Sequence, residues 1–448
     1  MQAEDNRREE AARLLPEDTL WVRFAFVDHA GIPKAKAVYR EAFSERAEAG
    51  VGLASGVLAL DPSGQLQTAS GLSPVGEVRL VPDLSGLTRL PFVSGQAMVP
   101  CDMTEPDGRT PWNGCPRGAL RRVVDRLAGH GMEAKASFET EFYLIGPEGP
   151  QDETPYASSF ALTPAAEFAA ALAMALEEMG IPPRQYHAEV GHGQQELSVG
   201  EAVALAAADR RVLVLEAIRG VARRMDLEVI AAPKPFLDGA GNGHHLHVSL
   251  YSREDGGPVL FDSSGALSGA GSGFVAGILE HLPALMAFTA SSPNSYQRLA
   301  PGMWSSAYIC YGPDNREATV RLASPVAGSE ERTANVELKP VDATVNPYLA
   351  LAAVLAAGMD GMERNLDPGE PVLVDPATLS EEERASRGIR PLPVSLAEAL
   401  DALEEDEVLT EVLGEPLVRT HLAVNQGQAE AARALSPEEV AATARGLY

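Results

Sequence analysis

Two histidines placed two positions apart are the residues of this chain whose type and spacing point most directly to chemistry. His245 and His247 lie within Gly-Asn-Gly-His-His-Leu-His-Val-Ser-Leu at 241–250. Residues two apart in an extended strand project from the same face, so the two imidazoles could form one wall of a metal or phosphate site. The glycines before them allow a ligand to approach the main chain closely. A surface cluster or an adventitious metal binder would carry the same pattern.

Pairs of glutamates upstream could complete such a site. Glu139 and Glu141 share one face of an expected strand at 135–145, whose other face is largely aromatic and aliphatic. Two unpaired carboxylates this close repel each other, and a divalent cation would remove the conflict. Glu189 and Glu196 flank a glycine-containing turn, so both could point into the same cleft. A solvated outer strand and a solvated loop stay open as alternatives for these two pairs.

The set of donor atoms indicates which metal to expect. Hard carboxylate ligands with few imidazoles favour Mg²⁺ or Mn²⁺ over a structural zinc site, which would draw on cysteines or more histidines. The chain has three cysteines, Cys101, Cys115 and Cys310, which are too few and too scattered for a disulfide framework or a thiolate metal site. We expect them to be small buried side chains.

Hydrophobic patterning predicts the elements that must position these residues. After an exposed N-terminal helix, we expect helices at 116–130, 163–179, 201–225, 396–405 and 436–444. Further strands are expected at 20–26, 97–99, 227–232 and 245–251. The apolar stretch from Tyr348 predicts a buried helix, and the segment 367–393, rich in Pro, Glu and Ser, predicts a surface loop. The pair Asp107-Gly108 marks an expected domain boundary.

Length and charge limit the classes of partner. A chain of 448 residues exceeds a usual single domain, so a smaller and a larger domain are expected. Its net charge of -27 argues against a nucleic acid or an anionic membrane as partner, so any polyanionic substrate must be held by local cations. The acidic start lacks the layout of a signal peptide, and the apolar stretch near Tyr348 is too short to span a bilayer. We therefore expect a cytoplasmic protein.

The order of the motifs resembles the glutamine synthetase family along nearly the whole chain. In sequence they are Glu-x-Glu, Glu-(six residues)-Glu, Gly-x-Gly-x-His-x-His-x-Ser, Asn294-Ser-Tyr-x-Arg298, Asn315-Arg316 with Arg321 five beyond, Glu337, and Asn346-Pro347-Tyr348. The segments 22–36 and 81–84 are similar to that family's small N-terminal domain. The resemblance implies an α+β fold: an N-terminal extension at 1–15, a β-grasp-like domain at 16–107, and a catalytic domain at 108–448. In the last of these, a bent antiparallel half-barrel sheet is flanked by helices.

The resemblance also implies a role for each site residue, with ATP as a substrate and two or more divalent ions in the site. It places Glu141, Glu189 and Glu196 on one metal and Glu139, His245 and Glu337 on the other. ATP and its phosphates would be bound by His247, Ser249, Arg316 and Arg321, with Arg316 also catalytic because its planar donor fork suits the charge that builds up in phosphoryl transfer. Glutamate would be bound by Gly241, Arg298 and Lys339. Surface salt bridges are the alternative for the arginines.

Four departures from the family pattern bear on substrates. Lys339 stands where the family has a second arginine, and Asn335 where it has another, which weakens the expectation of one glutamate contact and one phosphate contact. The family's Pro-Gly-Tyr-Glu run, whose glutamate serves ammonium, is here Pro-Gly-Met-Trp at 301–304. The stretch 50–56, comparable to an Asp-Gly-Ser-Ser loop, has no acid. Losing both acids suits an organic amine packed on Trp304, although Trp304 could instead be a core aromatic.

The expected function is therefore that of an ATP-dependent ligase, which forms γ-glutamyl phosphate and couples it to an organic primary amine, as in the γ-glutamyl-amide ligase and FluG-nodulin-like branch of the family. Diamines and polyamines stay open as substrates, although Leu53 and Trp304 favour a small, weakly charged or apolar amine. No general base is evident: the amine could arrive neutral, or an acid outside these motifs could serve. The alternatives are a true glutamine synthetase that uses ammonium and a non-catalytic regulatory homologue that binds nucleotide or amino acid.

The resemblance finally implies an assembly. In the family, the active site lies between the catalytic domain and the small domain of a neighbouring subunit, so we expect a homo-oligomer, with a dodecamer of two hexameric rings as the familiar form. Some relatives are regulated by adenylylation of a tyrosine in the C-terminal third. Between Tyr348 and Tyr448 this chain has no tyrosine, so that control is not expected at the family position.

Overall fold

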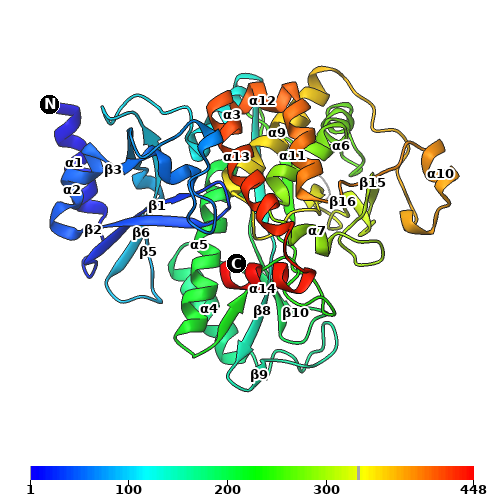
Figure 1. Ribbon diagram of the computed structural model, residues 1–448, viewed down its shortest axis with the longest axis horizontal. Helices are drawn as coiled ribbons and strands as arrows, with labels where there is room; N and C mark the ends of the chain where they lie inside the picture. The colour runs from blue at the N-terminus through cyan, green and yellow to red at the C-terminus, as the bar shows by residue number, and fades with distance from the viewer. Residues whose placement is uncertain (1, 330–332) are drawn as a thin grey trace.

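The computed structural model describes residues 2–329 and 333–448, so Met1 of the expected N-terminal extension lies outside the described residues. The extension forms helix α1 (Gln2–Leu14), as predicted. It contacts α2 (Arg40–Ala49) at the edge of the molecule, next to the first sheet (Figure 1).

The N-terminal part of the chain forms one mixed sheet with its own core. Its strand order is β2-β1-β6-β4-β3, with β5 paired to β6. Strand β1 is antiparallel to β2 and parallel to β6. Phe24 and Phe43 lie fully buried between the sheet and α2, with their rings edge to face. The strands are β1 (Trp21–Val27), β2 (Pro33–Tyr39), β3 (Val51–Ala54), β4 (Glu77–Pro82), β5 (Thr88–Arg89) and β6 (Gln96–Thr104), with short 3-10 helices η1 (Ser55–Ala59), η2 (Thr68–Ser70) and η3 (Leu84–Gly86).

The remaining strands form two further sheets. A five-stranded sheet has the order β10-β11-β8-β13, with β9 paired to β8, and a seven-stranded sheet has the order β12-β7-β14-β17-β16-β15-β18. All of the pairs are antiparallel except β15 and β16, which run parallel. The strands are β7 (Met132–Phe138), β8 (Thr140–Gly146), β9 (Gly149–Pro150), β10 (Pro183–Ala188), β11 (Gln194–Val199), β12 (Ala202–Val203), β13 (Glu228–Ile230), β14 (Leu246–Ser252), β15 (Tyr308–Pro313), β16 (Ala318–Ala323), β17 (Asn335–Leu338) and β18 (Arg390–Pro391).

The chain passes from one of these sheets to the other at Glu139. The single strand predicted at 135–145 is wrong at this residue, because β7 pairs with β14 whereas β8 pairs with β11 and β13. The backbone N–H of Glu139 still donates to His245 O at 3.0 Å, and that of Glu141 donates to Gly243 O at 3.1 Å. Glu139 thus lies between the two strands and Glu141 lies in β8, but both stay against the same segment, 243–245.

Helices cover these sheets and supply most of the large core. They are α3 (Pro116–Gly129), α4 (Ala166–Glu178), α5 (Ala204–Arg223), α6 (Gly269–Thr289), α7 (Ser295–Arg298), α9 (Pro347–Glu363), α10 (Glu381–Ser386), α11 (Leu396–Glu405), α12 (Glu407–Leu413), α13 (Glu415–Ala432) and α14 (Pro437–Leu447), with the 3-10 helix η4 (Pro376–Thr378). Helices α6 and α9 approach closely, since a Cβ on Gly277 would lie 2.1 Å from Ala357 O. The α+β class, with an N-terminal β domain and a large catalytic part, is confirmed.

Some elements differ from the sequence-based expectation. The segment 367–393 contains η4, α10 and β18 rather than a loop alone, and α6, α12 and α13 were not predicted. Helix α6 is long and apolar enough to cross a membrane, but 78% of its most apolar 18-residue window is buried inside the protein. The three cysteines are buried and free, as expected.

The start of α9 ties the N-terminal sheet to the rest of the molecule. The side chain of Asn346 accepts hydrogen bonds from the N–H groups of Tyr348 and Leu349 and thereby caps the helix. Its amide nitrogen donates to Val27 O and Asp28 O, both at 3.0 Å. The Asn-Pro-Tyr motif therefore joins β1 to the central helices.

Candidate active site

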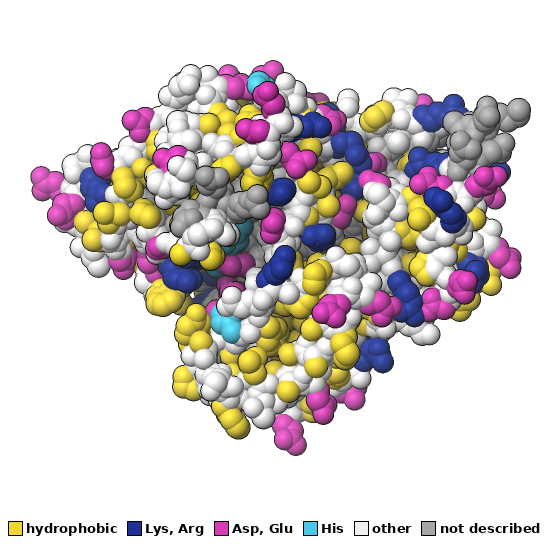
Figure 2. Space-filling model, turned by 180° about the vertical axis from the view of Figure 1, so that it is seen from behind, with side chains coloured by type: hydrophobic (Ala, Val, Ile, Leu, Met, Phe, Trp, Pro, Cys, Tyr) yellow, Lys and Arg dark blue, Asp and Glu magenta, His cyan; other side chains and the backbone are white. Residues whose placement is uncertain are grey.

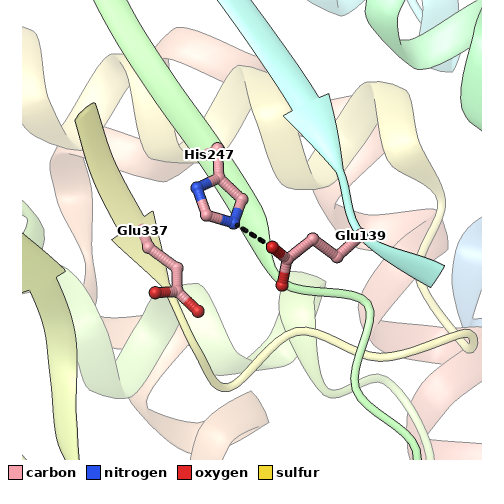
Figure 3. A group of neighbouring side chains, drawn as sticks. All are labelled: Glu139, His247 and Glu337. Carbon is pink, nitrogen blue, oxygen red and sulfur yellow. Dashed lines mark ion pairs between the residues drawn. The ribbon is translucent and has the colours of Figure 1, made fainter. Parts of the chain in front are cut away.

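The first acidic cluster lies where β14 and β17 pair beside Glu139. The strand register places His247 opposite Glu337, and Figure 3 shows both side chains directed toward Glu139. His247 Nε2 lies 3.2 Å from Glu139 Oε1. His245 Nδ1 lies 3.2 Å from Glu139 Oε2 and 3.4 Å from Glu337 Oε1. Single donor atoms of Glu139, His247 and Glu337 all lie within 4.8 Å of one another, which is the spacing of a cation site.

A second cluster lies on the neighbouring sheet. His187 Nε2 is 3.0 Å from Glu189 Oε1, and its Nδ1 is 3.9 Å from Glu196 Oε1. These three residues also form a group of cation-site dimensions. The registers of β10, β11 and β8 place His187 opposite Glu196 and Glu196 opposite Glu141. The structure thus brings the five predicted glutamates into two adjoining groups, with Glu139 and Glu337 in the first and Glu141, Glu189 and Glu196 in the second.

His187 and Tyr156 were missed at the level of sequence. His187 stands two residues before Glu189, and the same-face argument used for His245 and His247 would have found it. Tyr156 packs edge-on against His187 with ring centroids 6.0 Å apart. It lies in an irregular loop, so no periodic pattern marked it. Both Glu189 and Arg316 lie close enough to act on its phenol, and the net effect, dominated by burial, is a raised pKa.

Glu141 is the most enclosed carboxylate of the second group. Its Oε2 accepts the N–H of Gly243 at 2.9 Å and the side-chain amide of Gln194 at 3.3 Å. Gln194 also donates to Gly241 O at 2.8 Å and so fixes the glycine-rich segment beside the site. A Cβ on Gly243 would lie 2.4 Å from His245 Nε2, which explains why that position has no side chain.

The carboxylates of the site differ sharply in pKa. Burial raises the pKa of Glu141 to about 8, assisted by Glu189, and burial raises that of Glu196 to about 9, assisted by Glu139 and Glu141. Burial would also raise the pKa of Glu337, but Lys339, His247 and His245 outweigh it and lower that pKa to about 2. For Glu139 the histidines likewise outweigh burial, so its pKa lies well below the ordinary value.

The two histidines differ in charge: His245 is neutral, whereas His247 is protonated. Burial, followed by Lys339, lowers the pKa of His245 to about 4, so its imidazole is neutral and able to bind a metal. Burial would lower the pKa of His247 too, but Glu139 and Glu337 raise it to about 9. Asn335 Oδ1 accepts a hydrogen bond from His247 Nδ1 at 2.7 Å. Asn335, where the family has an arginine, therefore orients His247.

Two of the predicted cations, Arg321 and Lys339, lie against Glu337. Arg321 Nη1 lies 2.8 Å from Glu337 Oε2, and Lys339 Nζ lies 3.4 Å from Glu337 Oε1. Ser249 follows His247 on the same face of β14 and donates to Ala334 O at 3.3 Å. Arg316 is exposed in the turn before β16.

Figure 2 shows acidic and histidine side chains gathered in a hollow near the middle of the face opposite to that of Figure 1.

The predicted glutamate-binding residues adjoin the same site. Arg298 is buried, and its Nη2 donates to Lys339 O at 3.2 Å and to Val341 O at 3.1 Å. Its Nε has no hydrogen-bond partner among the described residues. A Cβ on Gly241 would lie 2.5 Å from Arg298 Cγ, so the glycine lets the main chain lie directly against the arginine.

Trp304 does not belong to the core. Its side chain is 60% exposed, and its backbone φ is 56°. The backbone N–H of Trp304 donates a hydrogen bond to Glu317 Oε1 at 2.7 Å. The alternative of a buried core aromatic is therefore wrong for this chain. The acid-free stretch 50–56 packs within the N-terminal sheet, where Gly52 lies against Glu77 and Gly56 against Ser73.

Comparison with known families agrees with this fold and site. The profile of the glutamine synthetase N-terminal domain matches residues 6–112, and that of the glutamine synthetase catalytic domain matches residues 113–442. The chain belongs to the glutamine synthetase family and is an ATP-dependent ligase of the type that joins an amine or ammonia to glutamate. The predicted boundary at 107/108 stays a prediction.

Individual relatives cover nearly the whole chain. Gamma-glutamylpolyamine synthetase of Streptomyces coelicolor is 39% identical over 438 residues, which is 95% of this chain and 93% of the relative. The glutamine synthetase of Methanocaldococcus jannaschii is 32% identical over 91% of each chain. A solved glutamine synthase homologue superposes with a TM-score of 0.87 at 36% identity, covering 97% and 100% of the two chains. A GmaS/ADP complex superposes with a TM-score of 0.84 at 29% identity and covers 98% of both.

Proposed function

We propose that this ligase forms γ-glutamyl phosphate from glutamate and ATP and transfers the γ-glutamyl group to an organic primary amine. The observation that carries the proposal is Trp304, an exposed aromatic on a strained turn at the position where ammonium-using relatives have a glutamate. An aromatic ring can pack against the alkyl part of an amine, whereas ammonium needs anionic partners to replace its water. The similarity to a gamma-glutamylpolyamine synthetase supports the same conclusion.

The carboxylates fit the divalent ions that the family uses. Burial and neighbouring acids raise the pKa of Glu141 to about 8 and that of Glu196 to about 9, so their ionised forms are disfavoured, and a bound cation would stabilise those forms. Glu141, Glu189 and Glu196 would hold one Mg²⁺ or Mn²⁺ ion, with His187 as a further donor to this group. Glu139, His245 and Glu337 would hold the other. When bound, such ions neutralise charge on the transferring phosphoryl group.

The cations of the chain would then act on the phosphates. Arg321 contacts Glu337 across one face of the sheet and can reach an anion beside it. Arg316 would stabilise charge on the γ-phosphoryl group, while protonated His247 and the Ser249 hydroxyl would donate hydrogen bonds to phosphate oxygens. The γ-carboxylate oxygen of glutamate attacks the γ-phosphorus, and the bond to ADP breaks. The amine nitrogen then attacks the acyl carbon, phosphate leaves, and the nitrogen loses a proton.

Glutamate would be held by groups at the end of the same site. The Nε of Arg298, which has no partner in the described part of the chain, can donate to the α-carboxylate. Lys339 would add a positive charge, and the main chain at Gly241 would contact the amino acid.

We further propose that the chain acts as a homo-oligomer, as its family typically does. A dodecamer, in which 50–56 of one subunit faces the site of the next, is the expected form, and the cytoplasm is the expected location.

The proposal is tested by phosphate release from ATP with glutamate and Mg²⁺ or Mn²⁺. The amine panel comprises ammonium, methylamine, ethanolamine, isopropylamine, putrescine and spermine, and products are identified by mass spectrometry. A γ-glutamyl amide as main product, with ammonium a poor substrate, is the expected result. Glutamine as main product would instead identify a glutamine synthetase, the function of the archaeal relatives. Absence of turnover with every amine would favour a regulatory homologue.

Substitution of Trp304 sharpens that test. In Trp304→Glu, a carboxylate returns to the position where ammonium-using relatives have one, so the ratio of kcat/KM for ammonium to that for the preferred amine should rise by about tenfold or more, because one charged hydrogen bond is gained. Trp304→Phe, which keeps an aromatic ring, is the matched control and should leave the ratio within about threefold. An unchanged ratio in Trp304→Glu would remove Trp304 from the amine pocket.

A further inference from the structure

Glu317 is a buried carboxylate to which the motif assignments give no role. It precedes β16 and is 8% exposed, directly after the exposed Arg316. Its Oε1 accepts the N–H of Trp304 at 2.7 Å, and the backbone of Gly302 gives its carboxylate a further hydrogen bond. A carboxylate that accepts two main-chain N–H groups of one short turn fixes the shape of that turn.

The turn needs such a restraint because its backbone is unusual. Within five residues, Gly302, Trp304 and Ser306 have φ values of 74°, 56° and 66°. A bulky residue such as tryptophan rarely adopts a positive φ, and a conformation of this kind persists only where surrounding contacts impose it. The carboxylate of Glu317 is one such contact, and it holds the residue whose ring is left exposed.

Other contacts place this turn at the border of the candidate active site. Ser305 Oγ donates to Arg298 O at 2.8 Å, which joins the turn to the predicted glutamate-binding arginine. On the other side, Glu317 leads into β16, where Arg321 is paired with Glu337. Lys339 lies close enough to Glu317 to act on its charge. The turn is therefore held between the residues assigned to glutamate and those assigned to phosphate.

We propose that Glu317 is a positioning residue that sets amine selectivity by holding Trp304 in its exposed, strained conformation. This inference rests on the proposed amine ligase function and extends it, because it identifies what keeps the aromatic wall of the amine pocket in place. Glu317 acts through its acceptor oxygens on the main chain. It accordingly affects recognition of the amine and leaves formation of γ-glutamyl phosphate untouched.

Two substitutions separate the acceptor role from a role of the charge. Glu317→Gln keeps a side-chain oxygen that can accept the Trp304 N–H, whereas Glu317→Ala removes it. KM for the amine that wild type uses best should rise about tenfold or more in Glu317→Ala, as the loss of a hydrogen bond to a charged group predicts, and stay within about threefold in Glu317→Gln. KM values for ATP and glutamate should not change in either variant. Glu370→Ala, which removes an exposed acid, is the control.

A double-mutant cycle with Trp304→Ala excludes a general loss of structure. If Glu317 acts through Trp304, Glu317→Ala should raise the amine KM no further in the Trp304→Ala background. Equal losses in Glu317→Gln and Glu317→Ala would mean that the charge is required and would overturn the positioning role, as would a rise in KM for ATP or glutamate. If wild type makes only glutamine, the proposed function fails; if wild type makes a γ-glutamyl amide and Glu317→Ala keeps its amine KM, this inference alone fails.

Discussion

Glu139 and Glu337 face cations of their own chain, whereas Glu141 and Glu196 face mainly other carboxylates. The pKa of the first pair is lowered, because His247, His245 and, for Glu337, Lys339 outweigh burial. The pKa of the second pair is raised by burial and by neighbouring acids. The fold thus compensates the charge of the first pair, whereas the charged forms of the second pair lack such compensation from the described residues. Ionised Glu139 and Glu337 therefore stabilise the metal-free protein, whereas ionised Glu141 and Glu196 destabilise it.

The largest expected effect is on turnover in Glu196→Gln. The amide keeps the shape of the side chain but removes a metal ligand, so kcat for phosphate release should fall about 100-fold to 1000-fold. The metal-free variant should nevertheless be at least as stable as wild type, because an uncompensated buried acid has gone. Steady-state kinetics and urea unfolding measure the two effects. Glu201→Gln, at an exposed position, is the control, and unchanged turnover in Glu196→Gln would remove it from the metal site.

Glu337→Gln should have the opposite effect on stability. It leaves Arg321 and Lys339 beside a neutral amide, and removing one partner of a buried ion pair costs about 3 kcal/mol or more. The free energy of unfolding in urea, without metal, measures this change. Glu363→Gln breaks the exposed pair with Arg126 and should cost less than about 1 kcal/mol. Similar stability in the Glu337 and Glu196 variants would contradict the contrast between the two pairs.

The pH dependence of stability follows from the same contrast. Glu141 and Glu196 bind protons in the folded state up to about pH 8 and 9, whereas their ordinary pKa is 4.5. The folded protein therefore binds more protons than the unfolded chain, and its stability is lost as the pH rises toward those values. His247, with a pKa raised to about 9, acts in the same direction.

Between pH 7 and pH 8.5, the metal-free protein should lose up to about 1.4 kcal/mol of unfolding free energy per pH unit for each such group. Below this range, the lowered pKa values of the buried His29, His244, His245 and His421 act in the opposite direction. Saturating Mg²⁺ should flatten this dependence, since the ion replaces the protons. Urea unfolding across this pH range, with and without Mg²⁺, measures both curves. Stability that rises with pH in the metal-free protein would show that these carboxylates are already compensated.

The smallest effect sharpens the composition of the second group. His187 lies against Glu189 and Glu196, so His187→Ala should weaken Mn²⁺ binding about tenfold, whether the ring binds the ion or orients the carboxylates. Isothermal titration with Mn²⁺ measures the affinity. His192→Ala, in the exposed turn between β10 and β11, should leave it unchanged. Equal affinities in wild type and both variants would limit this group to its glutamates.

The sequence by itself determined the donor types and their order. Period-two spacing predicted His245 and His247 on one side of a strand. His245 lies just before β14, yet both imidazoles approach Glu139, and the motif series indicated the family that the profiles confirm. Helices such as α11, predicted at 396–405, can also be predicted from local sequence, because the spacing of apolar residues on one face indicates the helix. Local sequence does not determine the position of Glu139. The expected strand is interrupted there because the residues before it pair with β14 and the residues after it pair with β11 and β13.

Only the tertiary structure decided the charge state of each group and the surroundings of Trp304. Glu139 and Glu141 are equivalent in sequence pattern, yet one faces histidines and the other faces carboxylates, and the distances that set a pKa join residues about a hundred positions apart. Two hydrogen bonds likewise depend on segments that meet only in the folded chain. One joins Asn335 to His247, and the other joins Glu317 to the backbone N–H of Trp304. Spacing along a chain fixes which face a side chain occupies, but electrostatic energy depends on distances that only the packed fold creates.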